Sequence, residues 1–215
     1  MTKAAGKAQS TKKPRRRAYP RKNDIVLAAA EQAFLQSGFA GTSMDAIAEI
    51  AGVSKKTVYN NFANKEALFG EVIRKRCDEV IPTEVDPADM EVDPEEVLVK
   101  MATSFLSKIF TPEQIALYQT VVTDARQFPE LGRLMLEGPI LRSQTVFDKY
   151  LRQQVDAGRM KFPDVDLAAP QLVALLKTNV HMKLMMSQKV PLSRARIAKL
   201  ARASVQLFLH GALLK

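Results

Sequence analysis

Two short helical patterns with a single glycine between them lie in residues 42–62, and they restrict the fold more than any other feature. The first pattern repeats apolar residues at helical spacing: Met44, Ile47, Ala48 and Ala51. Gly52 ends this pattern, and Ser54 is placed as the N-cap of a second helix that buries Val58 and Phe62. So short a turn forces the second helix across the first, so the segment predicts a helix-turn-helix.

A longer helix is predicted before this motif, over residues 23–37. Its apolar stripe consists of Val26, Leu27, Ala30, Ala33 and Phe34. Gly38 follows as a stop signal. Thr42 is predicted to cap the next helix, because Asp45 stands three residues later as in a capping box. Val53 and Val58 stand at the positions of a hydrophobic staple.

The side chains of the second short helix that do not face the core include no acid. They are Lys55, Lys56, Thr57, Tyr59, Asn60 and Asn61. A DNA duplex carries one negative charge per roughly 1.7 Å of its axis, so an acidic side chain there would be repelled. The composition of this helix therefore suits a DNA groove.

The net charge of +9 comes from the N-terminal arm. Residues 1–22 hold nine Lys or Arg and no acid, which leaves 23 basic and 23 acidic residues in the rest of the chain. We expect a disordered arm that contacts DNA in the minor groove or through counterion release, with three arginines as the main candidates. These are Arg15, Arg16 and Arg17. The alternatives are a solubilising tail or a patch that binds anionic membranes.

The remaining apolar residues recur at helical spacing, and alternating strand patterns are scarce, so we expect an all-α fold of about nine helices. Later helices are predicted over 65–80, from Leu98 to Ile109, 112–127, from 128 onward with a kink at Gly138-Pro139, 167–188 and 193–214. Residues 78–99 contain nine acids and no base, which is typical of a solvated linker. The predicted parts are the arm 1–22, a DNA-binding domain 23–69 and a larger helical domain 70–215.

Several other classes of protein lack support in the sequence. No apolar run spans a membrane and no secretory signal is recognisable, so we expect a cytoplasmic protein without a membrane partner. Cys77 is the single cysteine, and His181 and His210 lie within predicted helices as core or interface residues. These residues form no catalytic or metal-ligand cluster, so neither an enzyme nor a cofactor is predicted.

Residues 23–69 resemble the DNA-binding domain of the TetR (tetracycline-repressor-like) family. The resemblance lies in three runs: Gly38-Phe-Ala-Gly-Thr-Ser-Met-Asp-Ala-Ile-Ala48, Ala51-Gly-Val-Ser-Lys-Lys-Thr-Val-Tyr-Asn-Asn-Phe62 and Asn64-Lys-Glu-Ala-Leu68. It implies a homodimeric regulator, commonly a repressor, that binds a palindromic double-stranded DNA operator and is released by a small-molecule inducer.

The resemblance also implies which residues contact DNA. Ser54 starts the helix that enters the major groove, where Lys55, Lys56 and Thr57 are the candidates for base edges. The positions with a family role in phosphate binding are Tyr59 and Asn60. Thr42 and Ser43 stand at the start of one helix and Lys65 at the start of another. These three residues are further candidate phosphate sites. Tyr59 could instead pack on the first helix, residues 23–37, and Thr42 could be only a cap.

The C-terminal part is implied to hold an apolar ligand pocket and a dimer interface. The candidate pocket residues are Met101, Phe105, Tyr118, Val122, Phe128, Met135 and Phe147. The candidate interface residues on the last two helices are Leu172, Leu176, Val180, Leu184, Leu200, Ser204, Leu207 and Phe208. Both sets fit ordinary core positions as well. A rival function is a ligand-independent DNA-binding protein in which the basic arm dominates affinity.

Overall fold

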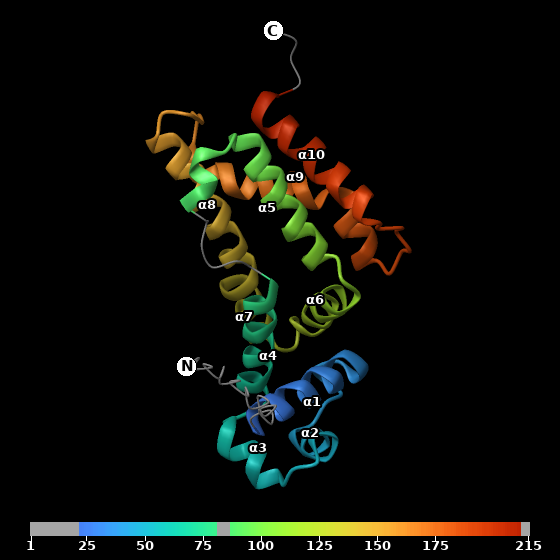
Figure 1. Cartoon of the computed structure of the whole chain (residues 1–215). Helices are drawn as coiled ribbons and strands as arrows, with labels where there is room; N and C mark the ends of the chain where they lie inside the picture. Colours follow the sequence, from blue (N-terminus) through green and yellow to red (C-terminus); the bar gives the residue numbers. More distant parts are fainter. Residues whose placement is uncertain (1–21, 81–86, 212–215) are drawn as a thin grey trace, which may run out of the picture.

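A computed structural model describes residues 22–80 and 87–211 of the chain, and all of its regular structure within those ranges is helical (Figure 1). The all-α prediction is confirmed for this part of the chain. The three arm arginines, Arg15 to Arg17, lie outside the described residues. None of the described helices is long and apolar enough to cross a membrane.

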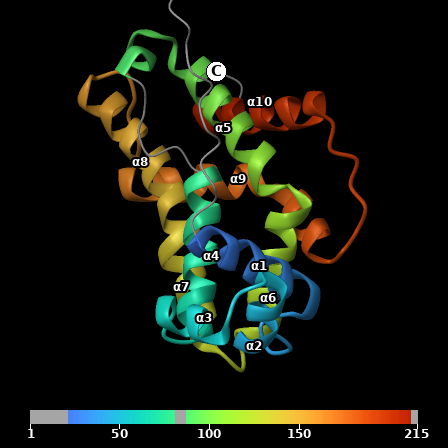
Figure 2. The same ribbon diagram turned by 60° about the horizontal axis from the view of Figure 1, so that its bottom comes forward.

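The lower end of the molecule in Figure 1 is a small helical head, and its helices lie within one residue of the predicted limits. They are α1 (Lys22–Ser37), α2 (Met44–Ala51), α3 (Lys55–Asn61) and the long α4 (Lys65–Val80), which leads away from the head. In the turned view of Figure 2, α2 and α3 form the end of the molecule opposite α10. The head therefore presents its helix-turn-helix away from the larger body.

The larger body follows a short 3₁₀ segment, η1 (Pro87–Glu91). Its helices are α5 (Pro94–Ile109), α6 (Pro112–Asp124), α7 (Pro129–Met135), α8 (Leu141–Asp156), α9 (Val165–Met185) and α10 (Arg194–His210). Thr111 caps α6, with Pro112 in its first turn as predicted. The predicted kink at Gly138-Pro139 is a π-helical segment, η2 (Leu136–Ile140), between α7 and α8. If α7, η2 and α8 are counted as one kinked helix, the described residues form nine α-helices.

The predicted cap of α2 is wrong by one residue. Ser43 caps this helix, because its hydroxyl accepts a hydrogen bond from the Ala46 amide at 3.1 Å. The Thr42 side chain is 5% exposed, and its hydroxyl lies 2.7 Å from the Gly38 carbonyl oxygen and 3.2 Å from that of Ala33. Thr42 therefore holds the turn after α1 instead of starting α2.

The acidic stretch 78–99 is not a linker throughout. Asp78 lies in α4 and pairs with Arg74 at 3.1 Å and also with Arg142 of α8. Asp93 caps α5 by accepting a hydrogen bond from the Glu95 amide at 2.8 Å. The first turns of α5 also bury Val97 and Leu98. The density of acidic residues predicted a solvated segment, but Asp78 forms ion pairs and Asp93 caps a helix.

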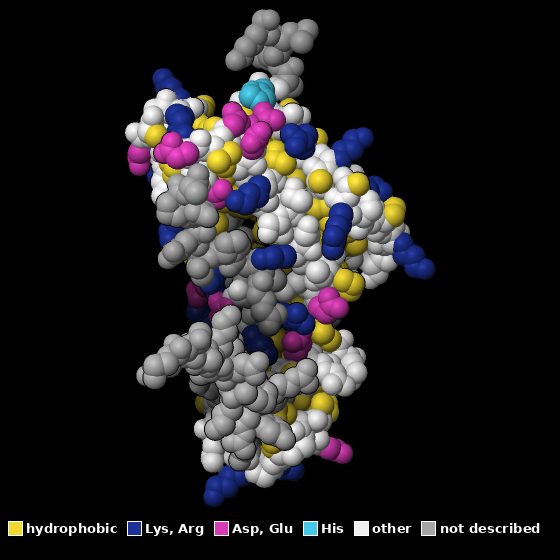
Figure 3. Space-filling view, viewed as in Figure 1, with side chains coloured by type: hydrophobic (Ala, Val, Ile, Leu, Met, Phe, Trp, Pro, Cys, Tyr) yellow, Lys and Arg dark blue, Asp and Glu magenta, His cyan; other side chains and the backbone are white. Residues whose placement is uncertain are grey.

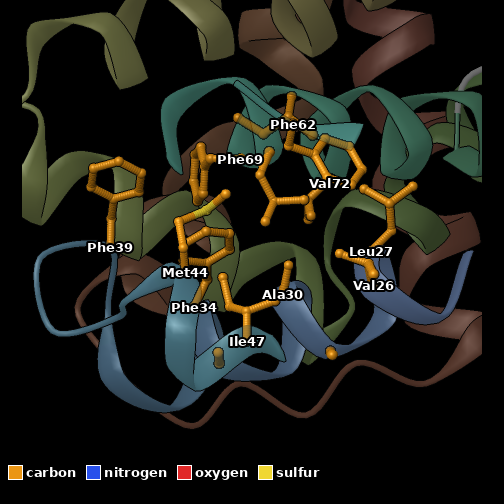
Figure 4. Packing of buried hydrophobic residues seen from close by; sticks show 14 of the residues in the cluster. Val26, Leu27, Ala30, Phe34, Phe39, Met44, Ile47, Phe62, Phe69 and Val72 are labelled. Carbon is orange, nitrogen blue, oxygen red and sulfur yellow. The ribbon is translucent and has the colours of Figure 1, made fainter. Parts of the chain in front are cut away.

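Two apolar clusters hold the molecule together. The first fills the head, where the rings of Phe34, Phe39 and Phe69 pack against one another with centroids 4.9 to 5.7 Å apart (Figure 4). It continues past residue 69 into α6 and α7 through Val121 and Leu131. The second cluster joins α5, α8, α9 and α10. The head therefore shares its core with α6 and α7.

Candidate DNA-binding surface and ligand cavity

The turn between α2 and α3 has the backbone that its sequence predicted. Gly52 adopts a left-handed conformation with φ of 63°, which a side chain would strain. Its amide and that of Val53 donate to carbonyl oxygens in the last turn of α2, both at 3.1 Å. Ser54 then caps α3 by accepting from the Thr57 amide at 3.2 Å. This turn fixes the angle at which α3 leaves α2.

The outward side of α3 is polar and cationic, as predicted. Val58 is buried and anchors the helix, whereas Lys56, Tyr59 and Asn60 are exposed. The Tyr59 side chain is 53% exposed, so it does not pack into α1 as the alternative interpretation required. In Figure 3 blue Lys or Arg side chains lie at the lower tip, where Figure 1 places α3. The head thus ends in a cationic, acid-free helix surface.

Three other side chains near α3 already have partners within the head. Lys55 donates to the Asp45 carboxylate of α2 at 2.6 Å, and this contact raises the pKa of Lys55 above its ordinary value. The hydroxyls of Ser54 and Thr57 lie 2.9 Å apart. Lys55 and Thr57 must exchange these contacts if they are to reach base edges.

The phosphate role predicted for Lys65 does not fit the structure. Its ammonium nitrogen donates to the carbonyl oxygens of Phe39 at 2.7 Å and Thr42 at 2.8 Å. It also lies 4.3 Å from the centre of the Phe39 ring, a cation–π distance. Lys65 therefore ties the start of α4 to the turn before α2. No residue spacing near Lys65 predicts this inward orientation of its side chain.

Hydrogen bonds attach the C-terminal end of helix α6 to the head, and the middle of α6 to the end of α9. The Asp124 carboxylate accepts hydrogen bonds from the amides of Phe39 at 2.8 Å and Ala40 at 3.2 Å, in the turn between α1 and α2. The Gln119 amide donates to the carbonyl oxygens of Leu184 at 3.2 Å and Met185 at 2.9 Å, at the end of α9. Neither residue was singled out from the sequence, because their partners are more than sixty positions away.

We predict that Asp124→Ala lowers the free energy of unfolding by about 1.5–3 kcal/mol, the usual contribution of a hydrogen bond to a charged group. Two amides of the turn lose their acceptor in this variant. Urea unfolding followed by circular dichroism measures the change. Asp156→Ala is the control, since Asp156 is an exposed acid at the end of α8. Equal midpoints for the two variants would contradict the assignment.

A cavity lies between the head-side helices and the C-terminal body. Its volume is about 70 Å³, and side chains from α4 to α9 form its wall. The wall residues are Ile73, Arg76, Phe105, Ile109, Gln114, Ile115, Leu117, Tyr118, Met135, Pro139, Ile140, Ser143, Lys177 and His181. The π-helical segment η2 contributes two of them, so the kink shapes the cavity.

Three of the seven predicted pocket residues line this cavity: Phe105, Tyr118 and Met135. Phe147 lies behind Phe105, with ring centroids 5.7 Å apart, and Met101 packs against the second core. The prediction that Val122 lines the pocket is wrong, because its side chain is 59% exposed. Phe128 is wrong because it packs on Phe39 in the head, with ring centroids 4.9 Å apart. Helical spacing identified apolar residues but not which side of each helix faces the cavity.

The cavity also contains charged and titratable groups that the sequence analysis missed. Arg76 forms an ion pair with Glu31 of α1. Lys177 and His181 come from α9 on either side of Thr178, where the backbone leaves the helical region with φ of 44°. Burial, and next the charge of Lys177, lower the pKa of His181 to about 4, so it is neutral at pH 7. Burial likewise lowers the pKa of Lys177.

Half of the predicted dimer residues are already buried within one chain. These are Leu172, Leu176, Val180 and Ser204. The others are exposed or partly exposed: Leu184, Leu200, Leu207 and Phe208. Ser204 instead donates to the Leu175 carbonyl oxygen at 3.2 Å and holds α10 against α9. The periodic pattern marked mainly the inner face of these helices, and Leu207 is the one exposed residue among the eight.

A capped, acid-free helix crossing a second helix at the tip of a helical head defines a helix-turn-helix DNA-binding protein. Comparison with known families agrees: residues 26–72 match the model "Bacterial regulatory proteins, tetR family" and residues 96–211 match "AefR-like transcriptional repressor, C-terminal domain". The chain belongs to the TetR family of transcriptional regulators and is not an enzyme.

Individual relatives are similar to this chain over most of its length. The HTH-type transcriptional regulator YhgD of Bacillus subtilis is 26% identical over 179 residues, which is 82% of this chain and 90% of YhgD. A TetR-family regulator from Mesorhizobium loti has a solved structure with a TM-score of 0.75 and 29% identity, covering 87% of this chain and 95% of its own. The structure named "Flavonoid-responsive Regulator FrrA" gives a TM-score of 0.74 and 31% identity, covering 89% and 96%.

Proposed function

We propose that this protein is a cytoplasmic repressor that binds a palindromic operator as a homodimer and is released when a small apolar molecule enters the cavity. The observation that carries the proposal is the exposed, acid-free side of α3 at the tip of a TetR-family head. A recognition helix of this kind lies in the major groove, with its N-terminal residues toward the bases.

The structure supports different roles for the residues predicted to contact DNA. Lys56 is exposed and is the foremost candidate for a base edge or a nearby phosphate, with Lys55 and Thr57 beside it. Tyr59 and Asn60 are exposed farther along α3, where phosphate contacts fix the register. Ser43 caps α2 next to free helix amides, which favour an anion. Thr42 and Lys65 act within the head.

The proposal is tested by selecting genomic fragments with the purified protein at near-physiological salt. We expect the recovered fragments to share one palindrome. The same selection with residues 1–22 removed shows what the basic arm contributes. Fragments without a common motif, or binding that depends on the arm alone, would contradict the proposal and favour the ligand-independent DNA-binding protein.

The proposed dimer forms through the outer face of α9 and α10, not through the buried face. Three large apolar side chains are exposed on these helices: Leu167, Met182 and Leu207. Small exposed residues, Ala174 and Ala203, lie where α10 is held against α9. A two-fold dimer formed on this face places two heads on successive half-sites of a palindrome.

Leu207→Glu is expected to give a species with the mass of one chain, 23.9 kDa, in light scattering. A charge placed on a 47% exposed apolar residue is buried without a partner when the dimer forms. The matched control is Val122→Glu on α6, where the same change at a 59% exposed residue leaves the dimer intact. Dimers of unchanged stability in Leu207→Glu would rule out this face.

Ligand release is supported by the way the cavity is joined to the head. Arg76 of the cavity wall pairs with Glu31 of α1, and α6 contributes cavity residues while Asp124 at its end holds the α1–α2 turn. A ligand that binds one arrangement of α4 and α6 better than another therefore shifts the positions of the heads. FrrA, the 31% identical relative, is flavonoid-responsive by name, which favours a small apolar inducer here also.

A further inference from the structure

The cavity has a mainly apolar wall, and its charged side chains are basic, with no acid among the wall residues. Phe105, Ile115 and Leu117 give it a hydrophobic lining from α5 and α6. Tyr118 and His181 meet edge to face on one side, with ring centroids 5.2 Å apart. Such a wall suits the apolar body of a ligand, and its few polar groups set the orientation.

One positive charge in this wall has no counterion. Arg76 is paired with Glu31, and His181 is neutral because its pKa is about 4. Lys177 forms no hydrogen bond or ion pair with any residue in the described parts of the chain, although its side chain is only partly exposed. The lowered pKa of Lys177 agrees with a charge that burial destabilises. Unpaired ammonium groups inside proteins are rare unless they serve a site.

We infer that the inducer of this protein joins the apolar body of the proposed ligand to one negative charge: it is a small monocarboxylate whose carboxylate pairs with Lys177 while its apolar body lies against Phe105 and Tyr118. The inference rests on the proposed function, since it names the chemical class of the ligand for that same cavity. The carboxylate restores neutrality in the cavity and recovers the desolvation cost of the lysine.

The cavity volume limits the size of the ligand. A single water needs a cavity of roughly 10–15 Å³, so 70 Å³ holds a small ligand body without rearrangement. Benzoate and hexanoate are suitable probes of this size, and benzamide and hexanamide are their neutral counterparts. Each pair has nearly the same shape and differs in charge.

The experiment measures the binding of these four probes to the full chain at pH 7 by ligand-observed NMR titration. We expect each carboxylate to bind at least about tenfold more tightly than its amide, as close charge pairs commonly give that much. Lys177→Met should remove this preference and leave amide binding within about twofold, whereas Lys177→Arg should retain it. Lys183→Met, an exposed lysine of the same helix, is the matched control.

Each outcome decides the inference. Equal binding of carboxylates and amides, no binding of either carboxylate, or a preference that survives in Lys177→Met would overturn it. The folded state of the variants is checked by their thermal unfolding curves, and the comparison of carboxylates with amides on the unaltered chain remains the test if Lys177→Met does not fold. Operator selection without ligand does not involve Lys177, so failure of the DNA-binding proposal is seen separately there.

Discussion

Lys56→Glu is expected to reduce operator affinity by at least about a hundredfold, the largest single effect on DNA binding that the structure predicts. Lys56 is exposed near the start of α3, and the substitution replaces an attraction to phosphate or guanine with a repulsion. Fluorescence anisotropy with a labelled operator at fixed salt measures the loss. The unfolding midpoint should not change, because the side chain is not in a core cluster.

The control for this variant must have the same change in net charge. Lys149→Glu provides it, since Lys149 is an exposed lysine of α8 in the larger body. We expect this control to lower operator affinity by less than about threefold, because charges farther than a Debye length from DNA, about 8 Å at physiological salt, are screened. Equal losses in the two variants would mean that overall charge, not the surface of α3, governs binding.

Phe39→Ala is expected to lower the free energy of unfolding by about 3–5 kcal/mol, which is a large share of the stability of a typical domain. The Phe39 side chain has an exposed fraction of 0%, and its ring contacts those of Phe34, Phe69 and Phe128. It also supports the ammonium group of Lys65. Denaturant titration followed by circular dichroism measures the change.

Phe39→Leu tests whether the aromatic cluster or the volume alone is responsible. It keeps most of the apolar volume, so we expect a smaller loss of about 1–2 kcal/mol. A loss below about 1 kcal/mol in Phe39→Ala would contradict the place of Phe39 in the aromatic cluster of the head, because large-to-small core changes cost more than that.

Local patterns predicted the head well because its determinants are close in sequence. The left-handed glycine at 52, the cap at Ser54 and the buried Val58 lie within seven residues of one another. The same short range explains the error at Thr42, since both Thr42 and Ser43 are good caps. The carbonyl oxygens of Gly38 and Ala33, to which the Thr42 hydroxyl donates, decide between them.

The cavity and the dimer face were harder to predict because they depend on which side of a helix is covered by distant elements. Helices α9 and α10 have apolar residues on two faces, and the pattern indicated the one that packs inside the chain. Lys177 gives no signal in the sequence, because a lysine in a helix is usually solvated. Its position in the wall follows from the packing of α9 on α6 and α8.

The most direct test of the central claim compares the affinity of the full chain for its selected palindrome with that for a scrambled duplex of equal length, at near-physiological salt. We expect a preference of about a thousandfold or more, as for specific regulators. The preference should persist without residues 1–22, because the bases are read by α3. A ratio below about tenfold, or one that disappears with the arm, would contradict a sequence-specific regulator.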